Sequence, residues 1–357
     1  MNIIQATTAY ETWVRDQIAI VAPDLARKHA AMNRALFPFL RATFYRWSQI
    51  WGEVCPDLAS SPAVLAVGDL HIENFGTWRD AEGRLIWGVN DFDEVARMPY
   101  AIDLVRLATS AILARAGGGV TIAPADACAA ILAGYADALR GGGGAFVLEE
   151  DHPKLRQLAL GAERDPTRFW AKAASWTPLG RVPAEVRALI EAQFPHRAGK
   201  VRVVHRVAGL GSLGRQRFVG LANWEGGMIA REAKAMLPSA YRWALGKSKG
   251  RIRYDEIIAR SVRCPDPFVR NRGGWLLRRI GPHCSRIELG DIPKMRDERV
   301  LLQHMGHETA NIHLGTPDAI AAIKSDLRRR KSGWLLAAAE AMAEATERDW
   351  KQWRARR

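Results

Sequence analysis

The spacing of apolar residues along the chain predicts helices at both ends and strands in the middle. From Pro23 to about Val54, apolar residues recur at the spacing of a helix, which predicts one long helix or two helices broken near Pro38. The same spacing predicts further helices over residues 101–116, 124–140, 295–314, 317–330 and 333–354. No internal repeat of the kind found in solenoid proteins is visible.

Two groups of strands are expected. Ala63–Val67 is a short apolar run, and residues 75–79 and 84–90 flank a turn-forming stretch, Asp80–Gly83, which predicts a strand followed by a β-hairpin. From Lys200 onward, runs rich in valine and phenylalanine alternate with glycines, which predicts strands over residues 201–208, 215–221 and 228–233. We therefore expect an α+β fold.

The net charge of +14, from 52 Lys and Arg against 38 Asp and Glu, is concentrated in one segment. Residues 200–292 carry 19 basic and 7 acidic residues, a net charge of +12, whereas residues 1–199 are nearly neutral. Phosphates, nucleic acid or an anionic surface are all possible partners for such a segment, and charge alone does not choose among them. The basic residues are interleaved with apolar ones, which favours a folded unit over a basic tail.

These patterns suggest three parts. Residues 1–199 would form a helical lobe, residues 200–292 a basic β-rich lobe, and residues 293–357 helices that pack on the first lobe. The four cysteines show no C-x-x-C spacing, no apolar run approaches the ~18 residues of a membrane span, and the first residues do not resemble a signal peptide. We expect reduced thiols, no membrane span and a cytoplasmic protein; the oligomeric state is left open.

Carboxylates and an amide gather in two loops at the ends of predicted strands. Gly68–Asn74 has the sequence GDLHIEN, and Asn90–Glu94 has the sequence NDFDE. Magnesium-dependent phosphoryl transfer uses such groups: one carboxylate accepts a proton from the attacking hydroxyl, while an amide and a second carboxylate bind the cation through oxygen. The five-residue offset from Asp69 to Asn74 equals the Asp-to-Asn offset in the catalytic loop of protein kinases.

The hairpin between the two loops would carry Asp91 back beside Asn74. Loops of this composition can also be simple turns, but two of them joined by a hairpin favour a metal–nucleotide site. Asp69 is then the candidate catalytic residue, with Asn74 and Asp91 as metal ligands. Asp93 is a further metal ligand or a partner of the basic lobe.

A glycine-rich segment, Gly209–Gly214, has the sequence GLGSLG between two predicted strands. A dinucleotide-binding loop would open a helix, whereas a kinase-type loop joins strands over the phosphates. We therefore expect a nucleotide-binding loop in which the contacts come from Gly209, Gly211, Ser212 and Gly214. An ordinary hairpin loop in an unrelated domain is the alternative.

In kinases a basic side chain on the third strand of the sheet contacts the phosphates. Arg231 lies 17 residues after Gly214 and is the first candidate for this role. Lys234 is the alternative, and at three residues from Arg231 it would face the opposite side of a strand. Glu256 is a guess for the acidic partner of the basic group.

Together these motifs resemble the aminoglycoside phosphotransferase and choline kinase branch of the protein-kinase-like superfamily, and more closely the bacterial family called domain of unknown function 2252. The resemblance is carried by segments 38–41, 68–76, 90–94, 102–108, 209–214, 231–233 and 306–313. It implies that Asp69 is the catalytic base, that Asn74 and Asp91 bind magnesium, and that Asp103 anchors the catalytic loop. Val67 replaces a histidine usual in the phosphotransferases, and Arg231 replaces a lysine of the related family.

An ordinary kinase has its glycine loop before its catalytic loop, whereas here the order is reversed. We therefore expect a two-lobed, protein-kinase-like fold in circularly permuted order. The expected activity is ATP- and Mg²⁺-dependent phosphoryl transfer to a hydroxyl of an unidentified small molecule. AMP transfer on the same fold and nucleotide binding without catalysis are alternatives. Nucleic-acid binding by the basic lobe is a weaker alternative, as is a zinc site at His304 and His307.

Overall fold

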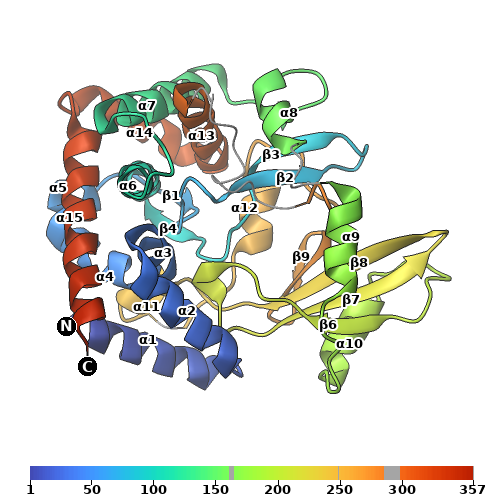
Figure 1. The fold of residues 1–357 in the computed structure, drawn as a ribbon. Helices are drawn as coiled ribbons and strands as arrows, with labels where there is room; N and C mark the ends of the chain where they lie inside the picture. Colours follow the sequence, from blue (N-terminus) through green and yellow to red (C-terminus); the bar gives the residue numbers. More distant parts are fainter. Residues whose placement is uncertain (161–164, 248, 285–297, 357) are drawn as a thin grey trace.

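The computed structural model describes residues 1–160, 165–247, 249–284 and 298–356. Within these ranges the chain is a mixed α+β structure whose sheets are all antiparallel, so the expected α+β class is confirmed (Figure 1). The expected boundary at residues 292/293 and the expected helix start at residue 295 lie outside the described residues. No helix within the described ranges has both the length and the apolar character needed to cross a membrane.

The N-terminal part is helical: α1 (Ile3–Gln17), α2 (Ala22–Arg34), α3 (Leu36–Ala42), α4 (Phe44–Val54) and α5 (Pro56–Ala59). The stretch expected to form one or two helices contains three, with breaks at Ala35 and Thr43. Pro38 lies in the first turn of α3, where its missing N–H costs no helical hydrogen bond, and so it does not mark the break. Helix α1 was not predicted, although a capping box between Asn2 and Gln5 marks its start.

The central segment contains β1 (Ala63–Ala66), β2 (Phe75–Arg79), β3 (Leu85–Val89) and β4 (Ala96–Pro99), followed by α6 (Ala101–Ala116), α7 (Pro124–Gly141) and β5 (Phe146–Val147). Strand β1 pairs with β4, and β2, β3 and β5 form a second small sheet. The predicted hairpin is confirmed, with Phe75 opposite Val89. This register lets Asn90 N donate to Asn74 O at 2.9 Å, so the two polar loops lie side by side.

The basic segment forms a five-stranded sheet of β6 (Arg202–His205), β7 (Arg217–Trp224), β8 (Gly227–Ala235), β9 (Arg270–Arg272) and β10 (Trp275–Ile280). Their spatial order is β6-β7-β8-β10-β9. The glycine-rich segment lies between β6 and β7 and contains a short 3₁₀ helix, Leu210–Ser212. Helices α11 (Ala240–Ala244) and α12 (Tyr254–Arg260) connect β8 to β9. Strands over the three predicted ranges are confirmed, whereas β9 and β10 were not predicted.

Helices α8 (Pro153–Ala159), α9 (Pro166–Ala174) and α10 (Ala184–Glu191) connect the central segment to this sheet. Apolar residues of α10, including Val186 and Ile190, pack on one face of the five-stranded sheet, and residues of α9, including Phe169, pack on the other. The expected helical lobe ends at residue 199, but α9 and α10 associate with the β-rich part, because their apolar stripes are buried against the strands (Figure 1).

The C-terminal helices α13 (Glu298–His313), α14 (Pro317–Arg329) and α15 (Trp334–Ala355) return to the helical part and lie beside α6 and α7. Their described ranges agree with the predicted helices. Glycines allow α7 and α13 to approach closely: a methyl group at Gly306 would lie 2.0 Å from the carbonyl oxygen of Ile131, and one at Gly134 would lie 1.8 Å from that of Gln303. Backbone-to-backbone packing therefore fixes this helix pair.

The Gly306→Ala variant should be destabilised by about 1–3 kcal/mol, because the added methyl group forces α7 and α13 apart. Gly52→Ala is the matched control: Gly52 lies in α4 with open space around its Cα, so the same substitution should stabilise the protein by about 0.5–1 kcal/mol. Chemical denaturation of both variants measures the difference. Equal changes in the free energy of unfolding in Gly306→Ala and Gly52→Ala would contradict the close packing of α7 on α13.

Candidate functional site

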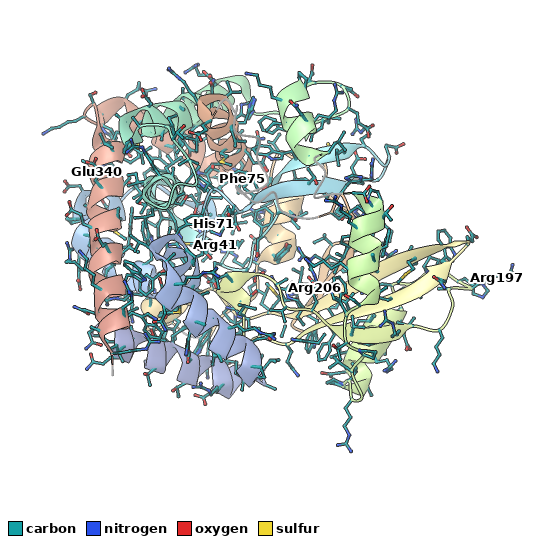
Figure 2. The ribbon with its side chains drawn as sticks, viewed as in Figure 1. Arg41, His71, Phe75, Arg197, Arg206 and Glu340 are labelled. Carbon is teal, nitrogen blue, oxygen red and sulfur yellow. The ribbon has the colours of Figure 1, made fainter. Side chains whose placement is uncertain are left out.

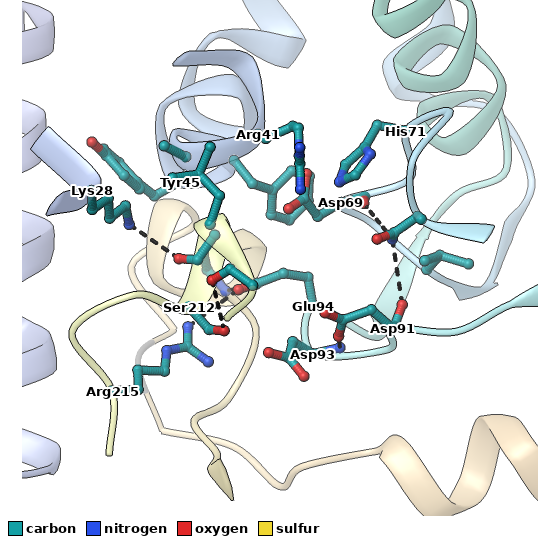
Figure 3. A pocket seen from close by; sticks show the side chains of 18 of the residues that line it. Lys28, Arg41, Tyr45, Asp69, His71, Asp91, Asp93, Glu94, Ser212 and Arg215 are labelled. Carbon is teal, nitrogen blue, oxygen red and sulfur yellow. Dashed lines mark hydrogen bonds and ion pairs between the residues drawn. The ribbon is translucent and has the colours of Figure 1, made fainter. Parts of the chain in front are cut away.

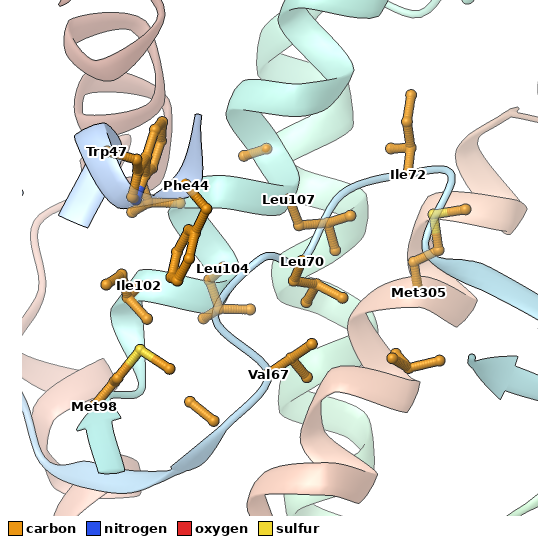
Figure 4. Packing of buried hydrophobic residues seen from close by; sticks show 14 of the residues in the cluster. Phe44, Trp47, Val67, Leu70, Ile72, Met98, Ile102, Leu104, Leu107 and Met305 are labelled. Carbon is orange, nitrogen blue, oxygen red and sulfur yellow. The ribbon is translucent and has the colours of Figure 1, made fainter. Parts of the chain in front are cut away.

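Helix α6 holds the loop that carries Asp69. Asp103, in the first turn of α6, is fully buried and accepts hydrogen bonds from the backbone N–H groups of Val67 and Gly68, both at 2.8 Å. His313 Nε2 of α13 lies 3.0 Å from the same carboxylate. Figure 4 shows residues 67–72 running over α6, with Leu70 directed into the apolar core. The anchor position implied for Asp103 agrees with this geometry.

Asp69 is paired with a buried arginine. Arg106 donates to Asp69 Oδ1 from Nε at 2.9 Å and from Nη2 at 2.5 Å. The guanidinium of Arg106 has no solvent exposure and lies against the rings of Phe44 and Trp47, at 5.0 and 4.8 Å from their centroids. Burial raises the pKa of Asp69 above its usual value, and Arg106 acts in the opposite direction. One oxygen of Asp69 is therefore held by Arg106, while the other is available on the pocket side.

The predicted metal ligands meet at this loop. Asn74 Nδ2 donates to the main-chain oxygen of Asp69 at 2.8 Å and to that of Asp91 at 3.5 Å. Because the amide nitrogen is engaged with the main chain, the side-chain oxygen of Asn74 is the atom that remains for a cation. Figure 3 shows Asp69, Asp91 and Asp93 around one pocket. The structure thus brings together the four carboxylate and amide residues that the sequence analysis selected.

Lys234 on β8 is the basic residue that reaches these carboxylates. Its Nζ lies 2.5 Å from Asp93 Oδ1 and 3.6 Å from Asp91 Oδ1, and its side chain is only 2% exposed. Burial and the neighbouring Asp91 raise the pKa of Asp93 to about 6, although Lys234 opposes this rise. Burial would also raise the pKa of Asp91, but the nearby positive charge of Lys234 holds it below its usual value.

Arg231, the first candidate for the phosphate-contacting residue, lies on the opposite face of β8. Its guanidinium packs on the ring of Phe268 at 4.4 Å, and its Nε donates to the main-chain oxygen of Gln193 at 3.2 Å. Successive residues of a strand face opposite sides, so residues 231 and 234 cannot both face the carboxylates. The structure brings Lys234 to this position and places Arg231 toward α10. Glu256 pairs with Arg253 and other arginines near α12, away from Lys234.

A carboxylate that the sequence analysis missed organises the strands around Lys234. Glu232 is fully buried on the same face of β8, and its oxygens accept hydrogen bonds from Arg206, Arg217 and Arg278 at 2.7–2.9 Å. Three arginines around one carboxylate leave an excess of positive charge at this end of the sheet. Figure 2 shows Arg206 on the side of the sheet that faces the helical part. In the sequence, Glu232 stands two residues before Lys234 and directly after Arg231. In a strand this spacing places Glu232 on the same face as Lys234, and it was the signal by which Glu232 could have been identified.

The glycine-rich segment lies directly over Asp69. Gly209 and Gly214 have φ angles of 74° and 98°, in the region that favours glycine. A methyl group at Gly211 would lie 3.3 Å from Asp69 Oδ2, so the loop and the carboxylate are close neighbours. Arg217 Nη2 donates to Ser212 Oγ at 3.2 Å, which connects the loop to Glu232.

The N-terminal helices complete the pocket, a contribution that sequence reasoning did not identify. Lys28 Nζ on α2 donates to the main-chain oxygen of Gly211 at 3.1 Å, and burial lowers the pKa of Lys28 to about 8. Arg41 pairs with Glu73. Tyr10, Lys28, Arg41 and Tyr45 line the pocket, whose empty volume is about 580 Å³, part of it open to solvent. Such side chains lie far from the glycine-rich segment in sequence, 183 positions in the case of Lys28 and Gly211, and carry no local motif.

Within the described part of the chain, no group of three or more His, Cys, Asp or Glu side chains is arranged to hold a metal ion. Magnesium commonly keeps several waters and takes one or two carboxylates from the protein, with phosphates supplying the rest. The Asn74 amide oxygen and the Asp91 carboxylate fit that limited role. His304 and His307 gather with His152 around Phe146, where burial lowers the pKa of His304 to about 4.

A family model matches part of the chain. It is described as an uncharacterized protein conserved in bacteria (DUF2252) and matches residues 21–167. The matched range contains the Asp69 loop, the 90–94 loop and α6, whereas the glycine-rich segment lies beyond it. No curated protein and no solved structure matches the chain. The chain is therefore similar to this bacterial family over the part that carries the carboxylates.

Replacing Lys234 with methionine should raise the pKa of Asp93 further above about 6, because the positive charge that opposes the effects of burial and of Asp91 is removed. Arg231→Met is the control, since it removes a cation from the opposite face of the same strand. Titration of ¹³C-labelled aspartate carboxyl groups by NMR measures both effects. An Asp93 pKa that moves equally in the two variants would contradict the assigned orientation of β8.

Proposed function

We propose that the chain is a Mg²⁺-dependent phosphotransferase of the protein-kinase-like type that transfers the γ-phosphoryl group of ATP to a hydroxyl of a small molecule. One observation carries the proposal: Asp69, Asn74 and Asp91 form a single hydrogen-bonded unit directly beneath a glycine-rich loop. Phosphoryl transfer depends mainly on positioning and charge stabilisation, and these groups supply both.

Each residue has a distinct role in this proposal. The oxygen of Asp69 that Arg106 does not hold accepts the proton of the attacking hydroxyl. The Asn74 amide oxygen and the Asp91 carboxylate would hold Mg²⁺, which would neutralise phosphate charge. Backbone N–H groups of Gly209–Gly214 cover the phosphates. The acceptor oxygen then bonds to the γ-phosphorus as the bond to the β-phosphate oxygen breaks, and ADP leaves.

Lys234 takes the role first assigned to Arg231. In protein kinases the phosphate-contacting lysine lies on the third strand, and β8 is the third strand of the five-stranded sheet along the chain. Lys234 forms an ion pair with Asp93 beside Asp91. From this position the Lys234 ammonium would supply positive charge to the phosphates of a nucleotide held beside Asp91.

The proposal includes the permuted order of a two-lobed, kinase-like fold. The carboxylate loops precede the glycine-rich loop by more than 100 residues, yet the two lie against each other. The hydrogen bond from Lys28 on α2 to Gly211 supports this arrangement, because it connects the N-terminal helices to the loop. The excess of arginines around Glu232 supports the binding of a polyanion at this end of the sheet.

A second candidate, nucleotide binding without catalysis, is favoured by one observation. Arg106 donates two hydrogen bonds to Asp69 Oδ1, and this pairing opposes the rise in the pKa of Asp69 that burial causes, so Asp69 is a weaker base than burial alone would make it. ATP labelled at the α- or γ-phosphate separates the candidates. Transfer of the γ label supports the proposal, transfer of the α label indicates AMP transfer, and binding without transfer over a broad panel of acceptors indicates a non-catalytic protein.

ATP should raise the melting temperature of the protein more with Mg²⁺ than with EDTA, because the cation couples the phosphates to Asn74 and Asp91. The Asp91→Asn variant should lose the Mg²⁺-dependent part of this shift. Asp16→Asn, which alters an exposed carboxylate on α1, should retain it. Thermal denaturation with a matched titration of ATP tests this. The same Mg²⁺-dependent shift in all three proteins would contradict the metal assignment.

Asp69→Asn should lower the rate of γ-phosphoryl transfer, including slow transfer to water, by about 10²–10⁴-fold, the usual contribution of a general base. The affinity for ATP and Mg²⁺ should stay close to that of the wild-type protein, since Asp69 is not assigned to the cation. Rates are measured by release of the γ label and affinities by calorimetry. Unchanged transfer in Asp69→Asn would exclude Asp69 as the base.

A further inference from the structure

A second cavity lies on the other side of the segment that carries Asp91 and Asp93. Its empty volume is about 430 Å³, part of it open to solvent. Asn90 and Phe92 line this second cavity, whereas Asp91 and Asp93 line the first. Alternate residues of the segment 90–93 thus line two different cavities, so the second cavity is adjacent to the proposed catalytic site and separate from it.

The second cavity combines aromatic walls with arginines. Trp78, Phe92 and Tyr254 supply aromatic surface, and Arg263, Arg278 and Arg279 supply positive charge. Arg263 lies between two rings, at 4.4 Å from the centroid of Trp78 and 4.8 Å from that of Phe92. This stacking fixes the plane of the guanidinium and leaves its edges as the only groups that can form hydrogen bonds.

The charge in the lining is unbalanced. Among the residues that the structure describes, Asp266 is the one carboxylate of the lining, and Asp266 Oδ2 accepts a hydrogen bond from Arg279 Nε at 3.2 Å. Arg278 Nε donates to Glu232 Oε1 at 2.7 Å, but Glu232 is shared with two other arginines outside the cavity. Glu308 acts electrostatically on Arg263 from outside the lining. The described lining holds three arginines and one carboxylate, which favours a negatively charged ligand.

The hydrogen bonds of Arg263 indicate which kind of ligand would bind. Its Nη2 donates to the main-chain oxygen of Val89 at 3.1 Å. Its Nε and Nη1 atoms are buried and have no acceptor among the described residues. Leaving a buried donor of a charged group without an acceptor is costly, so native proteins supply an acceptor from the protein, from water or from a ligand.

We propose that this second cavity binds the oxyanion group of a small molecule, with Arg263 as the main donor. A phosphate monoester fits best: it is an anion beside a lining with three arginines, and its oxygens accept hydrogen bonds from planar guanidinium groups. The aromatic walls would accommodate the organic part of the ligand. A carboxylate presents the same chemistry with a single charge.

The proposal does not depend on the phosphotransferase activity. The site shares the 90–93 segment with the candidate metal ligands, but its arginines and aromatic rings do not line the first cavity. A buried water is the competing explanation for the Arg263 geometry. Water would satisfy these donors, yet it would bring no negative charge to a lining that is rich in arginine.

Calorimetry with inorganic phosphate, at an ionic strength held constant with chloride, tests the site. We expect saturable binding that persists in the presence of a saturating non-hydrolysable ATP analogue with Mg²⁺, and that persists in Asp91→Asn. Arg263→Met should weaken phosphate binding by about tenfold or more. Arg260→Met, which removes an exposed arginine from the end of α12, should leave it unchanged.

Absence of binding beyond the chloride control, or equal affinities of the Arg263 and Arg260 variants, would overturn the proposal. Loss of phosphate binding on addition of the ATP analogue would assign phosphate to the first cavity and would also overturn it. If Arg263→Met does not fold, crystals of the wild-type protein soaked in phosphate decide the question: tetrahedral density beside Arg263 supports the site, and density for water alone refutes it. Failure of ATP to bind would concern the proposed function and not this site.

Discussion

The buried carboxylate of Asp103 is the constraint on which the arrangement depends. Asp103 accepts hydrogen bonds from the backbone N–H groups of Val67 and Gly68, and these bonds fix the chain just before Asp69 to the start of α6. His313 of α13 contacts the same carboxylate, so α6 and α13 are both connected to the loop that carries Asp69. Without these donors the buried carboxylate of Asp103 would carry a large desolvation cost, so the backbone of Val67 and Gly68 is held against it. Asp69 follows Gly68 directly, and its position therefore depends on the packing of α6.

The part of the site that lies at the β2–β3 hairpin could be predicted from local sequence patterns. The five-residue offset from Asp69 to Asn74 and the pairing of β2 with β3 are both readable from the sequence, and they suffice to bring Asp91 beside Asn74. Most long helices were likewise predicted, because their apolar periodicity extends over three or more turns. Short elements such as β9, β10 and α12 were not, because their few residues do not give a distinct period.

Tertiary contacts determine the rest of the site. Lys28 reaches Gly211 across more than 180 positions of the chain, and Glu232 gathers arginines from three strands or their flanking loops. The orientation of β8 decides between Lys234 and Arg231, and this orientation is set by the burial of Ala233 and Ala235 against α10. The basic charge of the segment is distributed accordingly, part of it facing Asp91 and Asp93 and part of it around the second cavity.

A crystal structure with a non-hydrolysable ATP analogue and Mg²⁺ tests the central claim most directly. The account predicts phosphates between Gly209–Gly214 and the pair Asn74 and Asp91, with the cation on the Asn74 amide oxygen and the Asp91 carboxylate. It also predicts that the Lys234 ammonium contacts a phosphate and that the γ-phosphate faces Asp69. A nucleotide bound elsewhere, or one bound here with the carboxylates of Asp69 and Asp91 directed away from it, would contradict the account.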